Sequence, residues 1–257
     1  MMKTVKLRGV EVGAGMPKVI VPIVAATRAG ILEKAREFKD HALDVVEWRV
    51  DFYEDVFETG QVLSTLEQLR AVLGDTPILF TFRTRKEGGE KDISTEDYIA
   101  LNSAVAQSGN ADAIDVEIFS GDQVVRKCID AIHAAGAVVV GSNHDFGKTP
   151  DKADLLYRLR KMQDMDADIP KIAVMPQGPA DVVTLLDATQ EMYTKYADRP
   201  IITMSMSNGV ISRLCGECFG SSMTFGAVGQ VSAPGQIPVE QLNTALKILH
   251  DALAPGK

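Results

Sequence analysis

The amino-acid sequence predicts an α/β protein built as a closed (β/α)8 barrel of the TIM type. Short apolar segments rich in β-branched residues alternate with longer amphipathic segments along the chain, which is typical of parallel α/β folds. The length of 257 residues suits one such barrel. Since no low-complexity tract or long linker interrupts the pattern, we expect a single barrel domain over residues 1–257.

Eight short segments have the length and composition of buried strands. They are residues 19–24, 45–50, 78–82, 113–118, 138–142, 171–175, 201–204 and 223–227. Eight segments with apolar residues three and four apart predict the helices. They are residues 29–43, 62–73, 95–108, 122–135, 152–165, 180–196, the short segment 209–219, and 238–253. The third helix has a clear start, because Ser94 can cap it and Glu96 and Asp97 suit the positive end of its dipole.

The segment before the first strand predicts a short N-terminal β-hairpin. It comprises residues 4–12 followed by Gly13 and Gly15, and we expect it to close the bottom of the barrel. An open doubly wound sheet is the structural alternative to a barrel. No Gly-x-Gly-x-x-Gly follows the first strand, so a dinucleotide-binding sheet of that kind lacks its fingerprint.

Charge and hydropathy exclude several functional classes. The formal net charge of −8 disfavours nucleic-acid binding, since no run of Lys and Arg offsets it. The N-terminus has no apolar run typical of a signal peptide, and the most apolar stretch, residues 19–26, is too short to span a bilayer. We therefore expect a cytoplasmic protein that binds no membrane.

The cysteines predict neither a disulfide framework nor a metal site. Cys128, Cys215 and Cys218 are an odd number in a chain of ordinary size. The last two have the Cys-x-x-Cys spacing of half a zinc site or of a redox pair, but no second pair is present. We interpret them as structural thiols.

Charged residues occur where the predicted strands end, and the reacting groups of parallel barrels cluster at that face. Glu47 and Arg49 share one face of the second strand, because side chains alternate with period two. A structural ion pair in the barrel core is the alternative interpretation of these two residues. The other charged candidates at strand ends are Arg83, Asp115, Glu117, His144 and Arg213.

Lys171 opens the sixth predicted strand. A lysine at a strand start is more often a solvent-exposed terminus. If its side chain instead points inward, burial and neighbouring cations lower the amine pKa and leave a neutral nucleophile for a ketone. A residue early in a strand lies low in the barrel, so periodicity alone does not select Lys171. His144 is similarly ambiguous, because a lone histidine after a strand is often a satisfied core or loop residue.

Six segments together resemble the type I 3-dehydroquinate dehydratase family, whose order along the chain they follow. They are Glu47-Trp48-Arg49-Val50-Asp51, Phe80-Thr81-Phe82-Arg83 with Lys86-Glu87-Gly88-Gly89-Glu90, Ser142-Asn143-His144-Asp145-Phe146, Ile169-Pro170-Lys171-Ile172-Ala173, Gly209-Val210-Ile211-Ser212-Arg213, and Ser232-Ala233-Pro234-Gly235-Gln236.

The resemblance implies a hydro-lyase on a (β/α)8 barrel, commonly a homodimer, that needs neither metal nor cofactor. It implies Schiff-base-dependent dehydration of 3-dehydroquinate to 3-dehydroshikimate in the shikimate pathway of aromatic amino acid biosynthesis. By this resemblance Lys171 forms the Schiff base, His144 acts as general acid and base, and Glu87 pairs with His144. The implied substrate-binding residues are Glu47, Arg49, Arg83, Arg213, Ser232 and Gln236.

One position departs from the family pattern, and two other functions remain open. Some family members carry a substrate-contacting serine where this chain has Pro22, which has no hydroxyl to offer. Residues 232–236 predict a mobile lid, with an ordinary barrel loop as the alternative. A class I aldolase shares the barrel and the lysine imine but cleaves a carbon–carbon bond. A barrel that only binds an anion is the non-catalytic alternative.

Overall fold

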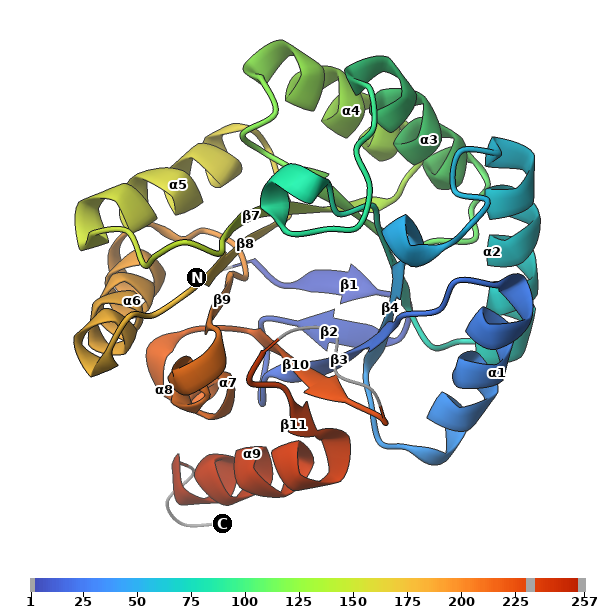
Figure 1. Ribbon diagram of the computed structural model, residues 1–257. Coiled ribbons are helices and arrows are strands. Elements are labelled where there is room, and N and C mark those ends of the chain that lie inside the picture. The colour runs from blue at the N-terminus through green and yellow to red at the C-terminus, as the bar shows by residue number, and fades with distance from the viewer. Residues whose placement is uncertain (1–2, 230–233, 254–257) are drawn as a thin grey trace.

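The computed structural model describes residues 3–229 and 234–253, and its centre is a ring of parallel strands (Figure 1). The strands of the ring are β3 (Lys18–Ile23), β4 (Val45–Arg49), β5 (Ile78–Thr81), β6 (Ala113–Glu117), β7 (Val138–Asp145), β8 (Ile169–Val174), β9 (Ile202–Ser205) and β10 (Met223–Ala227). Each strand from β3 to β8 pairs with the next along the chain, and β10 pairs with β3. An isolated bridge from Ile201 to Ser221 links the starts of the last two strands. This arrangement confirms the predicted α/β fold of TIM-barrel type.

Helices surround the strands on the outside of the ring (Figure 1). They are α1 (Arg28–Glu37), α2 (Thr59–Leu73), α3 (Thr95–Gln107), α4 (Asp122–Ala134), α5 (Lys152–Asp164), α6 (Pro179–Glu191), α7 (Ile211–Leu214), α8 (Gly216–Phe219) and α9 (Val239–Leu253). Ser94 caps α3 as expected, because its hydroxyl accepts a hydrogen bond from the N–H of Asp97. The apolar faces of these helices and of the strands form one continuous core.

Several predicted bounds differ from the structure. The first helix ends at Glu37 and is followed by a 3-10 turn over Phe38–Asp40, because the chain must leave the helix to bring Asp44 under β3. The segment 209–219 forms two short helices rather than one, since the backbone at Cys215 departs from helical geometry. Residues 192–196 end α6 as a π-helical turn. A two-residue strand, β11 (Ile237–Pro238), pairs with β10 and has no counterpart in the prediction.

The predicted N-terminal hairpin is confirmed. Strands β1 (Val5–Leu7) and β2 (Val10–Val12) pair antiparallel and lie behind the ring in Figure 1. Leu7 and Val12 are buried against the inward-facing residues of the strand starts, among them Ile20, Val45 and Leu79. The hairpin therefore closes the amino end of the barrel with apolar side chains.

At this amino end, aspartate side chains form hydrogen bonds that join neighbouring strands. Asp44, Asp112 and Asp168 each stand directly before a strand, respectively β4, β6 and β8. Each accepts a hydrogen bond of 2.7 Å from a main-chain N–H at the start of the preceding strand. Between β9 and β10 the hydroxyl of Ser221 does the same for Thr203, at 3.0 Å. The strands are thus joined two by two where they begin.

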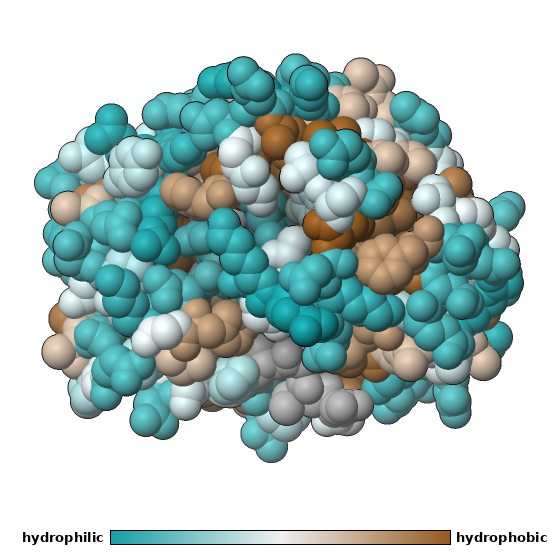
Figure 2. Space-filling view, turned by 45° about the horizontal axis from the view of Figure 1, so that its top comes forward, coloured by the Kyte–Doolittle hydropathy of each residue, from teal (hydrophilic) through white to brown (hydrophobic). Residues whose placement is uncertain are grey.

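Within the described ranges, no helix combines the length and apolar character that crossing a bilayer requires. Hydrophilic residues cover most of the face shown in Figure 2, and the hydrophobic ones form smaller groups between them.

Candidate active site

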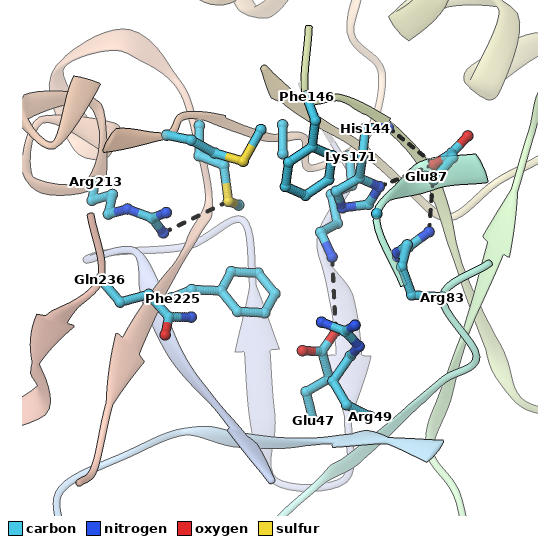
Figure 3. Close-up of a pocket in the computed structure, with 14 residues that line it drawn as sticks. Glu47, Arg49, Arg83, Glu87, His144, Phe146, Lys171, Arg213, Phe225 and Gln236 are labelled. Carbon is cyan, nitrogen blue, oxygen red and sulfur yellow. Dashed lines mark hydrogen bonds and ion pairs between the residues drawn. The ribbon is translucent and has the colours of Figure 1, made fainter. Parts of the chain in front are cut away.

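A pocket opens at the carboxyl ends of the strands (Figure 3), at the face where parallel barrels carry their chemistry. Its lining residues are Glu47, Arg49, Arg83, Glu87, Gly88, His144, Phe146, Lys171, Ala173, Met204, Met206, Arg213, Phe225 and Gln236. Every site residue expected from the sequence lines this pocket except Ser232, which lies outside the residues that the structure describes.

Lys171 is the third residue of β8 and its side chain points into the pocket, with 3% of the residue exposed. Its Nζ lies 3.8 Å from Oε1 of Glu47, 3.6 Å from Oδ2 of Asp115 and 4.6 Å from the centre of the Phe225 ring. The next residue of β8 that lines the pocket is Ala173, whose small side chain leaves room above the lysine. The interpretation of Lys171 as a solvent-exposed strand terminus is therefore wrong.

The environment of Lys171 favours the neutral amine. Burial lowers the pKa of the Lys171 amine, because the ammonium form loses its hydration. The carboxylates of Glu47 and Asp115 oppose this shift, and the guanidinium groups of Arg83 and Arg49 add to it. The net direction is downward, which increases the fraction of nucleophilic amine at neutral pH.

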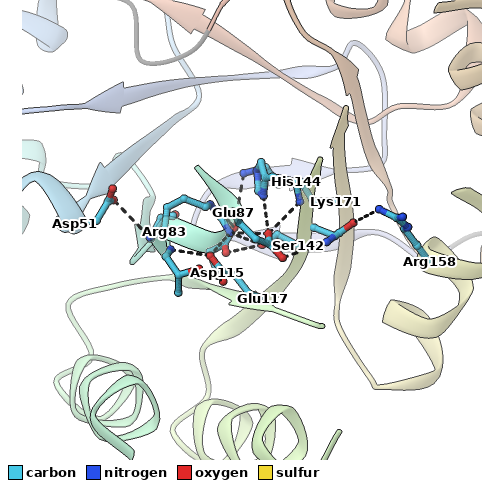
Figure 4. A network of polar contacts seen from close by, with 12 residues as sticks. Asp51, Arg83, Glu87, Asp115, Glu117, Ser142, His144, Arg158 and Lys171 are labelled. Carbon is cyan, nitrogen blue, oxygen red and sulfur yellow. Dashed lines mark hydrogen bonds and ion pairs between the residues drawn. The ribbon is translucent and has the colours of Figure 1, made fainter. Parts of the chain in front are cut away.

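His144 and Glu87 form a buried pair beside the lysine. Nδ1 of His144 lies 3.0 Å from Oε2 of Glu87, and the main-chain N–H of His144 donates to the same oxygen at 3.0 Å. Asn143 donates from Nδ2 to the other oxygen, Oε1, at 3.1 Å. Arg158 in turn donates to Oδ1 of Asn143 at 2.9 Å, which fixes the orientation of that amide (Figure 4). These contacts leave Nε2 as the imidazole nitrogen available to a ligand.

The two members of this pair have shifted pKa values. Burial and the carboxylate of Glu117 raise the pKa of Glu87 to about 8, while Arg83 opposes the shift. Burial and the cationic side chains of Arg83 and Lys171 hold the pKa of His144 well below its usual value. The imidazole is therefore neutral, and Glu87 is the member that takes up a proton as the pH falls through about 8.

Arg83 joins the carboxylates beneath the pocket into one network (Figure 4). Its Nη2 lies 2.7 Å from Oδ2 of Asp115 and its Nη1 lies 3.0 Å from Oε1 of Glu117. Nη1 also donates to the hydroxyl of Ser142 at 2.9 Å and lies 3.5 Å from Oε2 of Glu87. Asp115 and Glu117 hold the pKa of Arg83 well above its usual value in spite of its burial. Each of these buried charges thus has an opposite charge in contact with it.

Arg213 differs from Arg83 because its side chain has no carboxylate partner among the described residues. It is buried, with 1% of the residue exposed. Nη2 donates to the carbonyl oxygen of Pro234 at 3.2 Å and Nη1 contacts Sδ of Met204 at 3.7 Å, while Nε has no hydrogen-bond partner. Burial lowers the pKa of Arg213 to about 10. A buried guanidinium with unused donors fits the carboxylate of a ligand.

Glu47 and Arg49 face the pocket side by side, as the period-two pattern predicts. They do not form the structural ion pair that was the alternative interpretation. Arg49 makes a two-pronged pair with Asp51, with Nε to Oδ1 and Nη2 to Oδ2 both at 2.8 Å, whereas Glu47 accepts from the hydroxyl of Thr81 at 2.9 Å. Pro22 pairs with Glu47 in the β3–β4 register and is not among the lining residues.

Two residues of this site were not assigned a role from the sequence. Asp115 was noted only as a charge at a strand end, and Ser142 only as part of a motif. The available signal for Asp115 was its place in Ala113–Glu117, where two acids alternate with apolar residues in a strand that is buried throughout. That pattern matches the one that did select Glu47 and Arg49.

The cysteines take no part in the pocket. Cys128 and Cys215 are buried, and Cys218 is exposed. Burial raises the pKa of both Cys128 and Cys215 to about 11, so these thiols stay protonated and unreactive at neutral pH. In the part of the chain that the structure describes, no cluster of His, Cys, Asp and Glu has the geometry of a metal site.

Comparisons with known proteins find relatives that match nearly the whole chain. A family model described as type I 3-dehydroquinase matches residues 19–252. A 3-dehydroquinate dehydratase of Clostridioides difficile is 50% identical over 254 residues, which is 98% of this chain and 100% of that protein. A 3-dehydroquinate dehydratase of Escherichia coli is 54% identical over 98% of this chain and 100% of that protein.

Solved structures agree with these sequence matches. A type I 3-dehydroquinate dehydratase of Clostridium difficile with covalently modified comenic acid has a TM-score of 0.96 at 50% identity, covering 98% of this chain and 100% of that one. The 3-dehydroquinate dehydratase of Geobacillus kaustophilus has a TM-score of 0.94 at 36% identity, covering 97% of each chain.

Proposed function

The chain belongs to the type I 3-dehydroquinase family and is a 3-dehydroquinate dehydratase, and we propose that Lys171, His144 and Glu87 carry out its chemistry. The observation that carries this proposal is that the amine of Lys171 and the imidazole of His144 line one pocket with the guanidinium of Arg213, which has no carboxylate partner among the residues that the structure describes. One ketone bearing a carboxylate can therefore meet all three groups.

The first step forms an imine. The neutral amine of Lys171 attacks C3 of 3-dehydroquinate, and the ketone oxygen leaves as water after accepting two protons. The product is a cationic iminium that joins Nζ to C3. This cation withdraws electrons from the adjacent C2–H bond and makes its proton acidic.

His144 then moves the proton. Its neutral Nε2 removes the proton from C2, and the electron pair forms an enamine that expels the hydroxyl at C1. The protonated imidazole gives its proton to that hydroxyl, which leaves as water. Hydrolysis of the imine consumes one water, releases 3-dehydroshikimate and restores the amine, so one water is lost overall. Glu87 holds the ring with Nε2 toward the substrate through its contact with Nδ1.

Arg213 is the proposed partner of the substrate carboxylate, since its planar fork can bind both oxygens. Glu47, Arg49, Arg83, Ser232 and Gln236 complete the proposed substrate-binding set. Arg83 already contacts Asp115 and Glu117, so its contribution includes fixing the charge beneath the pocket. The segment 232–236, only part of which is described, is proposed to act as a lid over bound substrate.

Two finer properties also belong to the proposal. We propose that the enzyme is a homodimer and that it works in the cytoplasm, as the family resemblance implies. Sedimentation velocity tests the first: a species of twice the chain mass is expected, and a monomer across the micromolar range would contradict it.

Borohydride trapping tests the assignment of the lysine. Wild-type enzyme treated with borohydride in the presence of 3-dehydroquinate is expected to gain the mass of the reduced adduct on the peptide that contains Lys171. Lys171→Ala is expected to form no adduct and to show no rise in the ultraviolet absorbance of the conjugated enoate. A trapped adduct that persists in Lys171→Ala would assign the imine to another residue.

The same absorbance assay separates dehydration from the alternatives. Aldol cleavage uses a lysine imine as well, but it produces no conjugated enoate, and a binding barrel produces no new absorbance. The full-length relatives are dehydratases, which supports the dehydration.

A further inference from the structure

Two carboxylates contact the nitrogen of Lys171, and they differ in their access to the pocket. Glu47 Oε1 lies 3.8 Å from Nζ and belongs to a residue that lines the pocket. Asp115 Oδ2 lies closer, at 3.6 Å, but Asp115 is fully buried and is not a lining residue. Substrate can therefore touch Glu47, whereas Asp115 stays behind the lysine throughout the reaction.

The carboxylate of Asp115 is held on both oxygens. Oδ1 accepts a hydrogen bond of 2.6 Å from the hydroxyl of Ser142, and Oδ2 accepts one of 2.7 Å from Nη2 of Arg83 (Figure 4). Ser142 stands opposite Lys171 in the β7–β8 register. Both partners come from strands or turns of the barrel wall, so the position of the carboxylate is fixed by the fold.

The hydrogen-bond partners of Asp115 favour its ionised form. A guanidinium only donates, so the Ser142 hydroxyl must accept from Nη1 of Arg83 at 2.9 Å. The single hydrogen of that hydroxyl is then free to point at Asp115 Oδ1, which accepts it. Asp115 thus accepts from two donors, and both hydrogen bonds stabilise its carboxylate form. Arg83 and Lys171 lower the pKa of this carboxyl against the effect of burial, in agreement with the geometry.

We propose that Asp115 is the permanent counter-ion of the Lys171 nitrogen and keeps the imine protonated while His144 removes the C2 proton. The inference rests on the proposed imine at Lys171. Only a protonated imine is a strong electron sink, and a neutral imine would leave the C2–H bond almost unactivated. An anion that cannot exchange protons with the pocket stabilises the iminium cation at every stage, because its charge does not change.

Other groups around Nζ do not replace Asp115. The charged and titratable residues that face Lys171 from the neighbouring elements are Glu47 of β4, Arg49 of β4, Arg83 after β5, Asp115 of β6 and His144 of β7. The two arginines and any proton on the imidazole destabilise a cation. Glu47 stabilises it as well, but Glu47 lines the pocket and its carboxylate can pair with substrate groups instead. Asp115 is a positioning residue, since it acts through Lys171 and does not contact the substrate.

The test measures the pH at which kcat falls on the alkaline side of the kcat–pH profile, which is called the alkaline limb below. On this limb activity falls as the iminium loses its proton. Asp115→Asn preserves the size of the side chain and an acceptor oxygen for Arg83 but removes the charge. An opposite charge within 4–6 Å shifts a pKa by about 1–3 units, so the limb is expected to move to lower pH by at least about 1 unit. Ser142→Ala leaves the charge in place but removes one of its two hydrogen bonds, and the expected shift has the same direction and a smaller size.

Glu117→Gln is the matched control. It removes one negative charge from the same buried network, since Glu117 also pairs with Arg83 at 3.0 Å, but no ion pair joins Glu117 to Lys171 in the described part of the chain. Its alkaline limb is expected to move by less than half the shift of Asp115→Asn. An equal shift in both variants would attribute the effect to the charge of the network as a whole and would overturn the inference.

Borohydride trapping separates this inference from the proposed function. No adduct in the wild type would refute both. An adduct at Lys171 in Asp115→Asn, together with an alkaline limb at the wild-type pH, would refute the inference alone. If Asp115→Asn does not fold, Ser142→Ala decides: a limb displaced to lower pH supports the inference, and a limb at the wild-type position overturns it.

Discussion

At the amino ends of the strands, aspartates accept hydrogen bonds from the first N–H groups of neighbouring strands, whereas at the carboxyl ends buried acidic side chains gather around the charged residues of a pocket. Asp44, Asp112 and Asp168 each accept a hydrogen bond from a strand N–H, and each directly precedes a buried apolar residue at the closed end of the barrel. Asp112 and Asp168 also contact basic side chains, those of Arg70 and His133. Glu47, Asp115, Glu117 and Glu87 are instead buried around a pocket and face Lys171, Arg83 and His144.

This difference indicates that the acidic residues at the amino ends stabilise the fold, whereas those at the carboxyl ends serve the chemistry. An aspartate that accepts from a strand amide satisfies a backbone donor and holds two strands in register. A buried carboxylate beside another charge contributes little net stability, because its desolvation offsets the Coulomb attraction. The carboxyl-end charges therefore owe their usefulness to the pKa values that they impose on Lys171 and His144.

Removal of the imidazole is expected to have the largest effect. His144→Ala should lower kcat by at least ~10², since general acid–base catalysis supplies that much, while the imine still forms. The measurements are steady-state turnover and the mass of the borohydride adduct. Near-normal turnover would assign the proton shuttle to another residue. The unfolding free energy should change little, in keeping with a chemical role for this end of the barrel.

Removal of the buried guanidinium should weaken substrate binding. Arg213→Ala is expected to lower kcat/KM by roughly 10–100-fold, because a charge-assisted hydrogen bond contributes about 1.5–3 kcal/mol. Arg213→Lys is the control, since it restores the charge without the planar fork and should recover only part of the loss. A KM unchanged in Arg213→Ala would show that the substrate carboxylate binds elsewhere.

A variant at the amino ends of the strands should lose stability and keep its activity. Asp44→Ala leaves the N–H of Val19 without its partner and is expected to lower the unfolding free energy by about 1–3 kcal/mol, with kcat within about twofold of the wild type. Urea denaturation and steady-state kinetics measure the two quantities. Asp44→Asn keeps an acceptor oxygen and should be milder. A loss of activity at unchanged stability would contradict the assignment of a structural role to the aspartates at the amino ends.

The pH profile sharpens the account of the His144–Glu87 pair. Because the pKa of Glu87 is raised to about 8, the free enzyme should lose kcat/KM as the pH falls through about 8, when the pair gains a proton and Nε2 ceases to act as a base. In Glu87→Gln that titration is absent, and the pKa of His144 is already held well below its usual value by burial. The acidic limb should therefore move to lower pH. A limb at the wild-type pH in Glu87→Gln would exclude Glu87 as the titrating group.

Local patterns sufficed for the element order and for the kind of chemistry. Strand and helix periodicity depend on residues close in sequence, so the alternation of elements, the cap at Ser94 and the N-terminal hairpin were all predictable. The motifs that resemble the dehydratase family also contain most of the residues that line the pocket, but not Met204, Met206 and Phe225. The ends of elements were less predictable: the first helix was predicted over residues 29–43, but it ends at Glu37 and a 3-10 turn follows over Phe38–Asp40.

Amino-acid order alone determined that this chain forms a parallel α/β barrel and that lysine, histidine, arginine and acidic residues follow its strands. Tertiary structure decided which of those charges meet. Lys171 and Asp115 are 56 residues apart in the sequence, and only the stagger of neighbouring strands and the small side chain of Ala173 bring the amine to a buried carboxylate and an open pocket. The same holds for Arg213, because its surroundings within residues 3–229 and 234–253 place no carboxylate beside its guanidinium. Burial and contact set a pKa, and neither is encoded in the residue itself.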